Sequence, residues 1–430
     1  MTSYSGNYDY YLKEREIAVS VTASTGIAAT HINGLTIHAW SGIGIKNVLN
    51  SADLADMKTK KYLKDNLDKV QVLIIDEISM LHKNQLEMIN QVLKYFKKTD
   101  EAFGGIQVIL CGDFFQLPPV GNHNESNSSK FSFMSSAWLE AKFSICYLTK
   151  QYRQTDNDLN FVLNEIRSGN VSRKSKEILK SRENADIDSI EPTKLYTHNL
   201  DVDNLNFEQL NEIVGNEKKF KASKKGNPKL LETMAKSIMA KENMELKKKA
   251  KVMFVRNNPE KGYLNGSLGE ITKYSENGFP VVKLLNGNEI TTEQEEWKVE
   301  DQNGKSLASF KQIPLRLAWA ITVHKSQGMT LDCAEIDLSK TFERGQGYVA
   351  LSRLKELEGL RLIGLNQTAL EVDPLALKAD IRFQELSIEV ENTYFDEELE
   401  IITNQFIFKC GGVTDLDTIN ENKENLKKGN

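Results

Sequence analysis

The chain has 430 residues, of which 40% are hydrophobic and 27% are charged, and its formal net charge is −5. This composition is typical of a globular protein. No apolar run approaches the roughly 18 residues that a membrane-spanning helix needs, and the acidic balance gives no general sign of nucleic-acid binding. The four cysteines, Cys111, Cys146, Cys333 and Cys410, lack the CxxC spacing of a zinc site and fit a reducing compartment.

The first third of the chain alternates short β-branched runs with helical spacing. The stretch "NQLEMINQVLKYFKK" has the spacing of a helix, and it lies between two of the runs that read as strands. This alternation predicts a parallel sheet covered by helices. The predicted strands are Ile17–Ser24, Val70–Asp76, Ile106–Asp113 and Ser144–Thr149.

Later segments predict a second α/β domain that carries a small antiparallel barrel as an insertion, because Asn-Gly turns separate short strands there. The stretch "PLRLAWAITVHKSQG" predicts a helix. The lysine-rich segment Lys218–Lys251 is either a solvated helix face or a phosphate-contacting surface. The composition of the last roughly 20 residues predicts disorder. The expected domains are 1–150, then 151–246 with 311–385, with the barrel at 247–310 and a tail at 386–430.

The run "VLIIDEISML" ends a predicted strand in two acids, Asp76 and Glu77. Ligands bind at the carboxyl ends of strands in open α/β sheets. An aspartate there can hold Mg²⁺ directly or through water, and the neighbouring glutamate can orient or deprotonate the water that attacks a γ-phosphate. The competing interpretation is a chance pair of acids before a helix, where acids also favour the helix dipole.

Two further stretches carry candidate polar groups. "CGDFFQLPPVG" ends a predicted strand at the same edge of the sheet, and Gln116 within it suits the sensing of a γ-phosphate, unless the stretch is an ordinary surface loop. In "TASTGIAATHINGLTIHAWSGIG", the hydroxyls of Ser24, Thr25 and Thr36 are candidate donors to backbone phosphates. His38 is a candidate for stacking on a base, with core packing as the alternative.

Two arginines occur in later segments, Arg153 in "LTKQYRQTD" and Arg353 in "GQGYVALSRL". From a second domain they could reach across a cleft and stabilise charge on a transferring phosphoryl group. For either arginine alone, a surface ion pair is the alternative. The segment "AWAITVHKSQGMTLD" concentrates five polar side chains: Thr322, His324, Lys325, Ser326 and Gln327.

The chain closely resembles the Pif-type helicases of the RecD-like branch of superfamily one. The resemblance runs from about residue 17 to about residue 365, and "FQLPPV" and "HKSQGMTLD" are not shared by generic nucleotide-binding proteins. It rests on strings that occur in the same order: "TASTGIAA", "LTIHAWSGIG", "IIDEISML", "FGGIQVILCGDFFQLPPV", "LTKQYRQTD", "LNEIRSG", "LNGSLG", "QIPLRLAWAITVHKSQGMTLD" and "GYVALSRL".

The resemblance implies two RecA-like parallel-sheet domains with ATP between them, a Src-homology-3-like barrel, and a strand-separating wedge near residues 36–60. It implies ATP-driven 5′-to-3′ movement on single-stranded and fork DNA, in DNA repair, recombination and telomere maintenance. Asp76 and Glu77 then serve Mg²⁺ and water, and Gln116 contacts the γ-phosphate. The arginine fingers are Arg153 and Arg353, and Gly328 joins the nucleotide site. The implied DNA-facing or coupling residues are Ser24, Thr25, Thr36, His38, Thr322, His324, Lys325 and Ser326.

The family pattern also places GxxxxGK[ST] before the strand at "AVSVTAS", and this chain contains no such motif. About 16 residues precede that strand, whereas a strand, loop and helix need roughly 25, so "YYLKERE" could be the tail of a helix that comes after such a loop. The preferred hypothesis is a truncated reading of a longer helicase.

Three alternatives remain open at this point. The chain could be a single-stranded-DNA-binding module that does not hydrolyse ATP, or a split enzyme whose phosphate loop arrives on a separate polypeptide. It could also be the motor subunit of a RecD-type complex. We expect a monomer with no membrane association, cytoplasmic and nucleoid-associated if the source is a prokaryote or a virus, since no targeting signal is visible.

Overall fold

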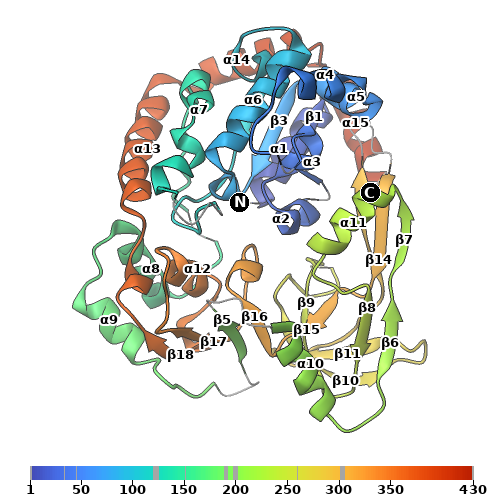
Figure 1. The fold of residues 1–430 in the computed structure, drawn as a ribbon, viewed down its shortest axis with the longest axis vertical. Coiled ribbons are helices and arrows are strands. Elements are labelled where there is room, and N and C mark those ends of the chain that lie inside the picture. Colours follow the sequence, from blue (N-terminus) through green and yellow to red (C-terminus); the bar gives the residue numbers. More distant parts are fainter. Residues whose placement is uncertain are drawn as a thin grey trace.

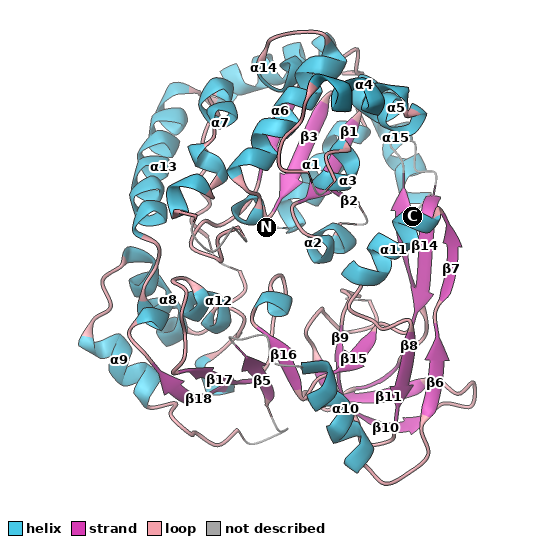
Figure 2. Cartoon of the chain, in the orientation of Figure 1, coloured by secondary structure: helices cyan, strands magenta, loops and turns pink. Residues whose placement is uncertain are grey.

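The computed structural model describes residues 2–32, 34–44, 46–119, 125–150, 152–187, 192–196, 202–258, 260–300 and 306–428. Figure 1 shows an upper lobe built from the N-terminal third, with C-terminal helices along its left side, top and right side, a second lobe at lower left, and a strand-rich region at lower right. Figure 2 shows the same view with helices and strands distinguished. None of the described helices is long and apolar enough to cross a membrane.

The first lobe is built on a parallel sheet with the strand order β2-β1-β3-β4. All five residues of β3 are buried, as a parallel strand covered on both faces requires. The predicted strands at "AVSVTAS", "VLIID" and "IQVIL" are therefore confirmed. Their bounds are β1 (Val19–Ala23), β2 (Leu35–Thr36), β3 (Val72–Asp76) and β4 (Gln107–Leu110).

Helices cover both faces of this sheet. Leu73 and Ile75 pack with residues of α3, α5 and α6 on one face. Val72 and Ile74 pack with α1 and α14 on the other face. The "YYLKERE" stretch lies mostly within α1, as expected. The helices of this lobe are α1 (Thr2–Lys13), α2 (Gly26–His31), α3 (Ile37–Ser41), α4 (Ser51–Thr59), α5 (Lys61–Lys69), α6 (Lys83–Lys97) and α7 (Ser136–Ala141).

The C-terminal segment returns to the first lobe as α13 (Pro374–Thr393), α14 (Asp396–Lys409) and α15 (Leu416–Lys428). The prediction of disorder for the last roughly 20 residues is therefore wrong for their described part, which contains α15. Ile407 and Ile419 are buried, and Gln71 Nε2 donates a hydrogen bond of 2.5 Å to the carbonyl of Cys410. A few such contacts hold polar helices against the sheet, and composition alone does not reveal them.

The second lobe contains another parallel sheet, with the strand order β16-β5-β17-β18. It receives strands from two distant parts of the chain, one before and three after the antiparallel insertion. Its strands are β5 (Thr193–Tyr196), β16 (Ala320–Thr322), β17 (Ala334–Leu338) and β18 (Leu360–Leu365). Its helices are α8 (Asn157–Ser168), α9 (Arg173–Lys180), α10 (Val202–Glu212) and α12 (Gln346–Leu351).

The helix predicted at "PLRLAWAITVHKSQG" is wrong. The stretch forms β15 (Leu315–Leu317), then β16, then a short 3-10 turn at His324–Ser326. β15 pairs with β9 and β16 pairs with β5, and both Leu315 and Ile321 are fully buried. An apolar run that is buried on all sides shows no alternation, so its periodicity does not separate strand from helix.

The antiparallel region holds a sheet with the order β12-β11-β10-β9-β15 and a second sheet with the order β13-β14-β7. Gly287 has φ +85° in the turn between β11 and β12, as the Asn-Gly signal predicts. The lysine-rich segment forms mostly exposed strands and α11 rather than one helix face. The bounds are β6 (Lys218–Lys221), β7 (Ser223–Gly226), α11 (Pro228–Ser237), β8 (Asn243–Leu246), β9 (Lys251–Phe254), β10 (Leu268–Tyr274), β11 (Pro280–Leu284), β12 (Glu289–Thr291), β13 (Glu295–Glu300) and β14 (Ser306–Gln312).

The strand predicted at Ser144–Thr149 is also wrong, because the segment is neither strand nor helix. Its exposure still alternates: Phe143, Ile145 and Tyr147 are partly buried and the residues between them are exposed. A β-strand requires a neighbour to pair with, and in the described part of the chain this segment has none. β4 is the edge strand of the first-lobe sheet, and it pairs only with β3 among the described strands.

Candidate active site

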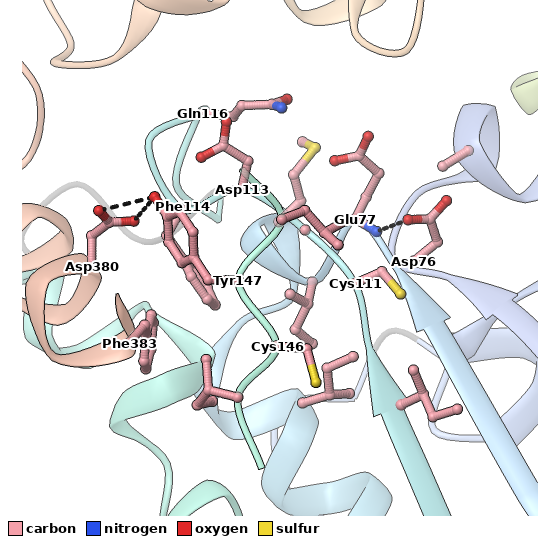
Figure 3. A pocket seen from close by; sticks show the side chains of 18 of the residues that line it. Asp76, Glu77, Cys111, Asp113, Phe114, Gln116, Cys146, Tyr147, Asp380 and Phe383 are labelled. Atoms are coloured by element: carbon pink, nitrogen blue, oxygen red, sulfur yellow. Dashed lines mark hydrogen bonds between the residues drawn. The ribbon is translucent and has the colours of Figure 1, made fainter. Parts of the chain in front are cut away.

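The end of β3 directs two consecutive carboxylates into one cavity. Asp76 is the last residue of β3, and Glu77 has φ +53°, in the left-handed region, before a 3-10 turn. Consecutive side chains on a strand point to opposite faces, so this change of backbone direction lets both acids line the same space (Figure 3). The turn is held by a bond of 2.9 Å from the Glu77 N–H to Asp76 Oδ1 and one of 2.6 Å from Ser24 Oγ to the Glu77 carbonyl.

A cavity of about 2550 Å³ lies where the two lobes meet. The carboxyl ends of β3 and β4 supply acids and Gln116 from one side, and Arg153 and Arg353 line it from the other. The structure thus brings together groups that are up to 277 positions apart in the chain (353 − 76). The sequence-predicted residues that line the cavity are Thr25, Asp76, Glu77, Gln116, Arg153, His324, Lys325, Gly328 and Arg353.

Burial dominates the electrostatics of the two acids. Burial, with a smaller contribution from the charge of Asp76, raises the pKa of Glu77 to about 7, and Arg353 opposes the rise. Burial also raises the pKa of Asp76, against the hydrogen bond from the Glu77 N–H. Glu77 Oε2 and Gln116 Oε1 are buried and have no hydrogen-bond partner among the described residues. Buried polar atoms are normally satisfied, so these two acceptors are suited to a ligand that brings donors or a cation.

The two arginines are held from the second lobe. Arg353 is 1% exposed, and its Nε donates to the Val349 carbonyl at 3.0 Å. Arg153 Nη1 donates to the Ser352 carbonyl at 3.3 Å. Burial lowers the pKa of Arg353, as does the adjacent charge of Arg153, while Glu77 raises it. Two neighbouring guanidinium groups in a buried site favour an anion between the lobes.

The remaining predicted DNA-contacting residues hold local structure. Thr36 caps α3 by accepting the N–H of Ala39 at 3.2 Å, and Thr322 Oγ1 accepts the N–H of Lys325 at 3.2 Å. Ser326 is fully buried and donates to a backbone carbonyl. The pKa of His38 is lowered by burial. Neither these four residues nor Ser24, which donates to the Glu77 carbonyl, lines the cavity.

A network that sequence reasoning missed ties the lobes together at one side of the cavity. Arg167 donates at 2.9 Å to Asp113 Oδ2, to the Tyr348 hydroxyl and to the Tyr147 hydroxyl, and it lies 3.7 Å from Asp380. Figure 3 shows Tyr147 bonded to Asp380 beside Asp113. The string "LNEIRSG" contained Arg167, but a string alone does not indicate which partners an arginine will have.

The Gln116 loop is anchored in the second lobe although it comes after a strand of the first. Phe115 and Leu117, on either side of Gln116, are buried in the core of the second lobe. A Cβ atom at Gly345 would lie 2.9 Å from the Phe115 carbonyl, so glycine is required there for this close approach. The position of Gln116 relative to Glu77 therefore depends on how the two lobes sit together.

Comparison with known proteins decides the family. The model for the PIF1-like helicase family matches residues 9–177. The chain is 47% identical to the ATP-dependent DNA helicase Pif1 of Psychrobacter sp. (strain PRwf-1), over 94% of this chain and 71% of that protein. The chain belongs to the PIF1-like helicase family. It spans between 55% and 71% of the length of the curated relatives that it matches.

Solved structures of PIF1-like helicases share the fold of this family member. Bacteroides sp Pif1 in complex with ADP-AlF4 matches with a TM-score of 0.77 and 32% identity, over 88% of this chain and 90% of that one. Bacteroides Pif1 in complex with ADP-AlF3 and ssDNA matches with a TM-score of 0.57 and 35% identity, over 85% and 86%. The two parallel-sheet lobes of this PIF1-like helicase are therefore RecA-like domains, as the sequence motifs predict.

Proposed function

We propose that this chain carries the motor of an ATP-dependent DNA helicase that moves 5′ to 3′ on single-stranded DNA and separates a duplex. The observation that carries the proposal is the single cavity in which the acids of one lobe face the arginines of the other. The names of its relatives, and the nucleotide and single-stranded DNA bound in the matching structures, support it. We further propose that the chain acts as a monomer, and that it is cytoplasmic and nucleoid-associated if the source is a prokaryote or a virus.

ATP and Mg²⁺ fit the residues that line this cavity. A divalent cation prefers carboxylate oxygens, and Asp76 would hold it, beside the unsatisfied Glu77 Oε2. Gln116, Gly328 and the two buried arginines would contact the nucleotide. When bound, ATP would supply the γ-phosphoryl group whose transfer to water drives movement.

The protein groups have separable tasks in this scheme. Glu77 orients the attacking water and accepts its proton at the carboxylate, and a pKa near 7 suits a general base at neutral pH. Arg153 and Arg353 neutralise charge that develops on the phosphate oxygens. Because Gln116 is anchored through Phe115 in the second lobe, opening and closing of the lobes changes its distance from Glu77.

Single-stranded DNA is proposed to bind where predicted side chains meet the rim of the cavity. Thr25, His324 and Lys325 line the cavity itself and would contact DNA or couple its position to nucleotide. The stretch from about residue 36 to about residue 60, which forms α3 and α4, is proposed as the wedge that separates strands. The proposed DNA-facing or coupling set is Ser24, Thr25, Thr36, His38, Thr322, His324, Lys325 and Ser326.

The deciding experiment measures binding of a fluorescent single-stranded DNA by anisotropy, with and without ADP and aluminium fluoride. A motor couples the two sites, so nucleotide should change the DNA affinity by about fivefold or more.

Glu77→Gln should abolish DNA-stimulated ATP hydrolysis and leave DNA affinity unchanged, whereas the exposed-site control Glu358→Gln should leave both unchanged. Hydrolysis at the normal rate in Glu77→Gln would refute the role given to Glu77.

A second function competes because the 430 residues contain no GxxxxGK[ST]. The chain would then be a single-stranded-DNA-binding module that does not hydrolyse ATP. Equal DNA affinity with and without nucleotide, together with no hydrolysis under any condition, would support the module and refute the motor.

A further inference from the structure

Helix α13 spans the junction between the two lobes. Near its start, Leu377 packs against the core of the second lobe. Further along, Phe383 packs against Phe114, which follows β4, and against Trp138 of α7, with ring centroids 6.0 and 5.8 Å apart. Figure 1 shows the helix running along the left side of the molecule from one lobe towards the other. One helix therefore contacts both lobes beside the cavity.

One face of α13 holds Tyr147 at two places. The Tyr147 N–H donates to Ser387 Oγ at 2.9 Å, and the Tyr147 hydroxyl donates to Asp380 Oδ1 at 2.9 Å. Asp380 and Ser387 are seven residues apart (387 − 380) within α13, which places them on the same side of a helix with about 3.6 residues per turn. Figure 3 shows the Tyr147 hydroxyl bonded to Asp380. The backbone and the phenol of Tyr147 are therefore both fixed by α13.

The donor and acceptor roles around Arg167 are fixed, because a guanidinium group can only donate. Its Nη2 donates to the Tyr147 hydroxyl oxygen and its Nη1 donates to the Tyr348 hydroxyl oxygen, both at 2.9 Å. Each phenol has one proton left to donate. Tyr147 donates its proton to Asp380, and Tyr348 donates its proton to Asp113 at 3.1 Å. A phenol and a carboxylate thus hold each end of the Arg167 guanidinium group.

Two carboxylates share the one guanidinium group of Arg167. Its Nη1 lies 2.9 Å from Asp113 Oδ2 and its Nη2 lies 3.7 Å from Asp380 Oδ1. None of the three side chains is more than 23% exposed, and charge-assisted hydrogen bonds are stronger than neutral ones. Because the guanidinium group is planar and rigid, the direction in which Nη1 meets Asp113 depends on what holds Nη2.

We propose that Tyr147 and Asp380 are positioning residues for nucleotide hydrolysis. They act through Arg167 on the loop that carries Gln116. Asp113 is the point of contact, since its side chain accepts from Arg167 and its carbonyl accepts the Gln116 N–H at 3.1 Å. The way in which the loop is held rests on these contacts alone, whereas its part in hydrolysis rests on the proposed function.

Tyr147→Phe tests the proposal, because it removes the hydroxyl and keeps the ring. Amide hydrogen exchange at Phe115 and Gln116 should accelerate by about fivefold, the effect of losing one hydrogen bond. The matched control Tyr62→Phe removes a hydroxyl from a residue that is 62% exposed, and it should change this exchange by less than about twofold. The same exchange rates in the two variants would overturn the proposal.

Combining Tyr147→Phe with Arg167→Met tests whether the phenol acts through the guanidinium group. Arg167→Met alone should accelerate exchange at Gln116 by about 25-fold. The double variant should show the same acceleration, because Tyr147 then has no guanidinium group to hold. Independent effects would multiply to about 125-fold, and that result would overturn the proposal.

Two substitutions of Asp380 test the contribution of α13. Asp380→Asn keeps an oxygen that accepts the Tyr147 hydroxyl, whereas Asp380→Leu removes it. Exchange at Gln116 should stay within about twofold of the native rate in Asp380→Asn and should accelerate by about fivefold in Asp380→Leu. Equal acceleration in both variants would contradict the hydrogen-bonded chain from Asp380 through Tyr147.

The kinetics of DNA-stimulated ATP hydrolysis separate a positioning role from nucleotide binding. In Tyr147→Phe, kcat should fall by about fivefold while KM for ATP stays within about twofold, because the change acts on Gln116 and not on nucleotide affinity. A raised KM with an unchanged kcat would overturn the positioning role. No hydrolysis by the native chain would instead refute the motor function, and the exchange measurements would still decide whether Tyr147 and Asp380 hold the loop.

Discussion

Arg167→Met tests whether one side chain holds the Gln116 loop to the second lobe. Methionine keeps the apolar stem against Phe115, whose ring lies 4.5 Å from the guanidinium carbon, but it removes the donors to Asp113, Tyr348 and Tyr147. Only the bond to Asp113 joins Arg167 to this loop, because Tyr348 lies on α12 and Tyr147 lies in the segment before α8. Arg167 retains 23% of its side-chain exposure, so we assign this charge-assisted bond about 2 kcal/mol rather than a fully buried value. The loop should therefore open more easily by about 2 kcal/mol.

Amide hydrogen exchange measures this opening at Phe115 and Gln116, whose N–H groups are bonded to Asp113 within the loop. Since 1.4 kcal/mol corresponds to a factor of ten, exchange there should accelerate by about 25-fold. The matched control is Arg173→Met, which removes an exposed pair with Glu177 and should change exchange by less than about threefold. Equal exchange in the two variants would refute the role given to Arg167.

Three other changes test separate parts of the structure. Ile407 is buried, so Ile407→Ala should lower the free energy of local opening of α14, measured by amide hydrogen exchange, by about 3 kcal/mol. The control Phe408→Ala replaces a residue that is 83% exposed and should leave this free energy unchanged. Equal effects of the two variants would contradict the docking of α14. Gly345 has φ +88° and lies against the Phe115 carbonyl, so Gly345→Ala should lower the free energy of unfolding by about 2 kcal/mol. The expected result is a lower thermal midpoint, and an unchanged midpoint would exclude the close approach of Gly345 to Phe115. Burial holds the pKa of His38 below 6.5, so His38 is protonated in the unfolded chain at a pH where it is still neutral in the folded chain. The free energy of unfolding should therefore fall as the pH drops from 6.5 towards 5. His38→Gln should reduce that fall, and an identical pH profile in the variant would refute the role given to His38.

Elements whose signal is local were predictable from the sequence. β3 is a run of apolar residues that ends in Asp76, and α6 has apolar residues at helical spacing; both formed where expected. That Asp76, Glu77, Gln116, Arg153 and Arg353 line one cavity was also predictable, because strand ends, motif strings and a family resemblance all point to them. How Asp76 and Glu77 share one cavity was not, since it depends on a left-handed backbone at Glu77.

What the sequence alone determined about this PIF1-like helicase is therefore the strands and helices that have a local signal, such as β3 and α6, and the identity of the residues at their ends. Tertiary structure decided the rest: "SICYLT" has strand propensity but no partner in the described chain, "PLRLAWAITV" became two strands through pairing with β9 and β5, and the polar C-terminal helices were ordered by a few buried contacts. Arg167 acquired its role only when Asp113 and Tyr348 were brought to it. Pairing, burial and charge contacts are properties of two segments together, so no single stretch of sequence contains them.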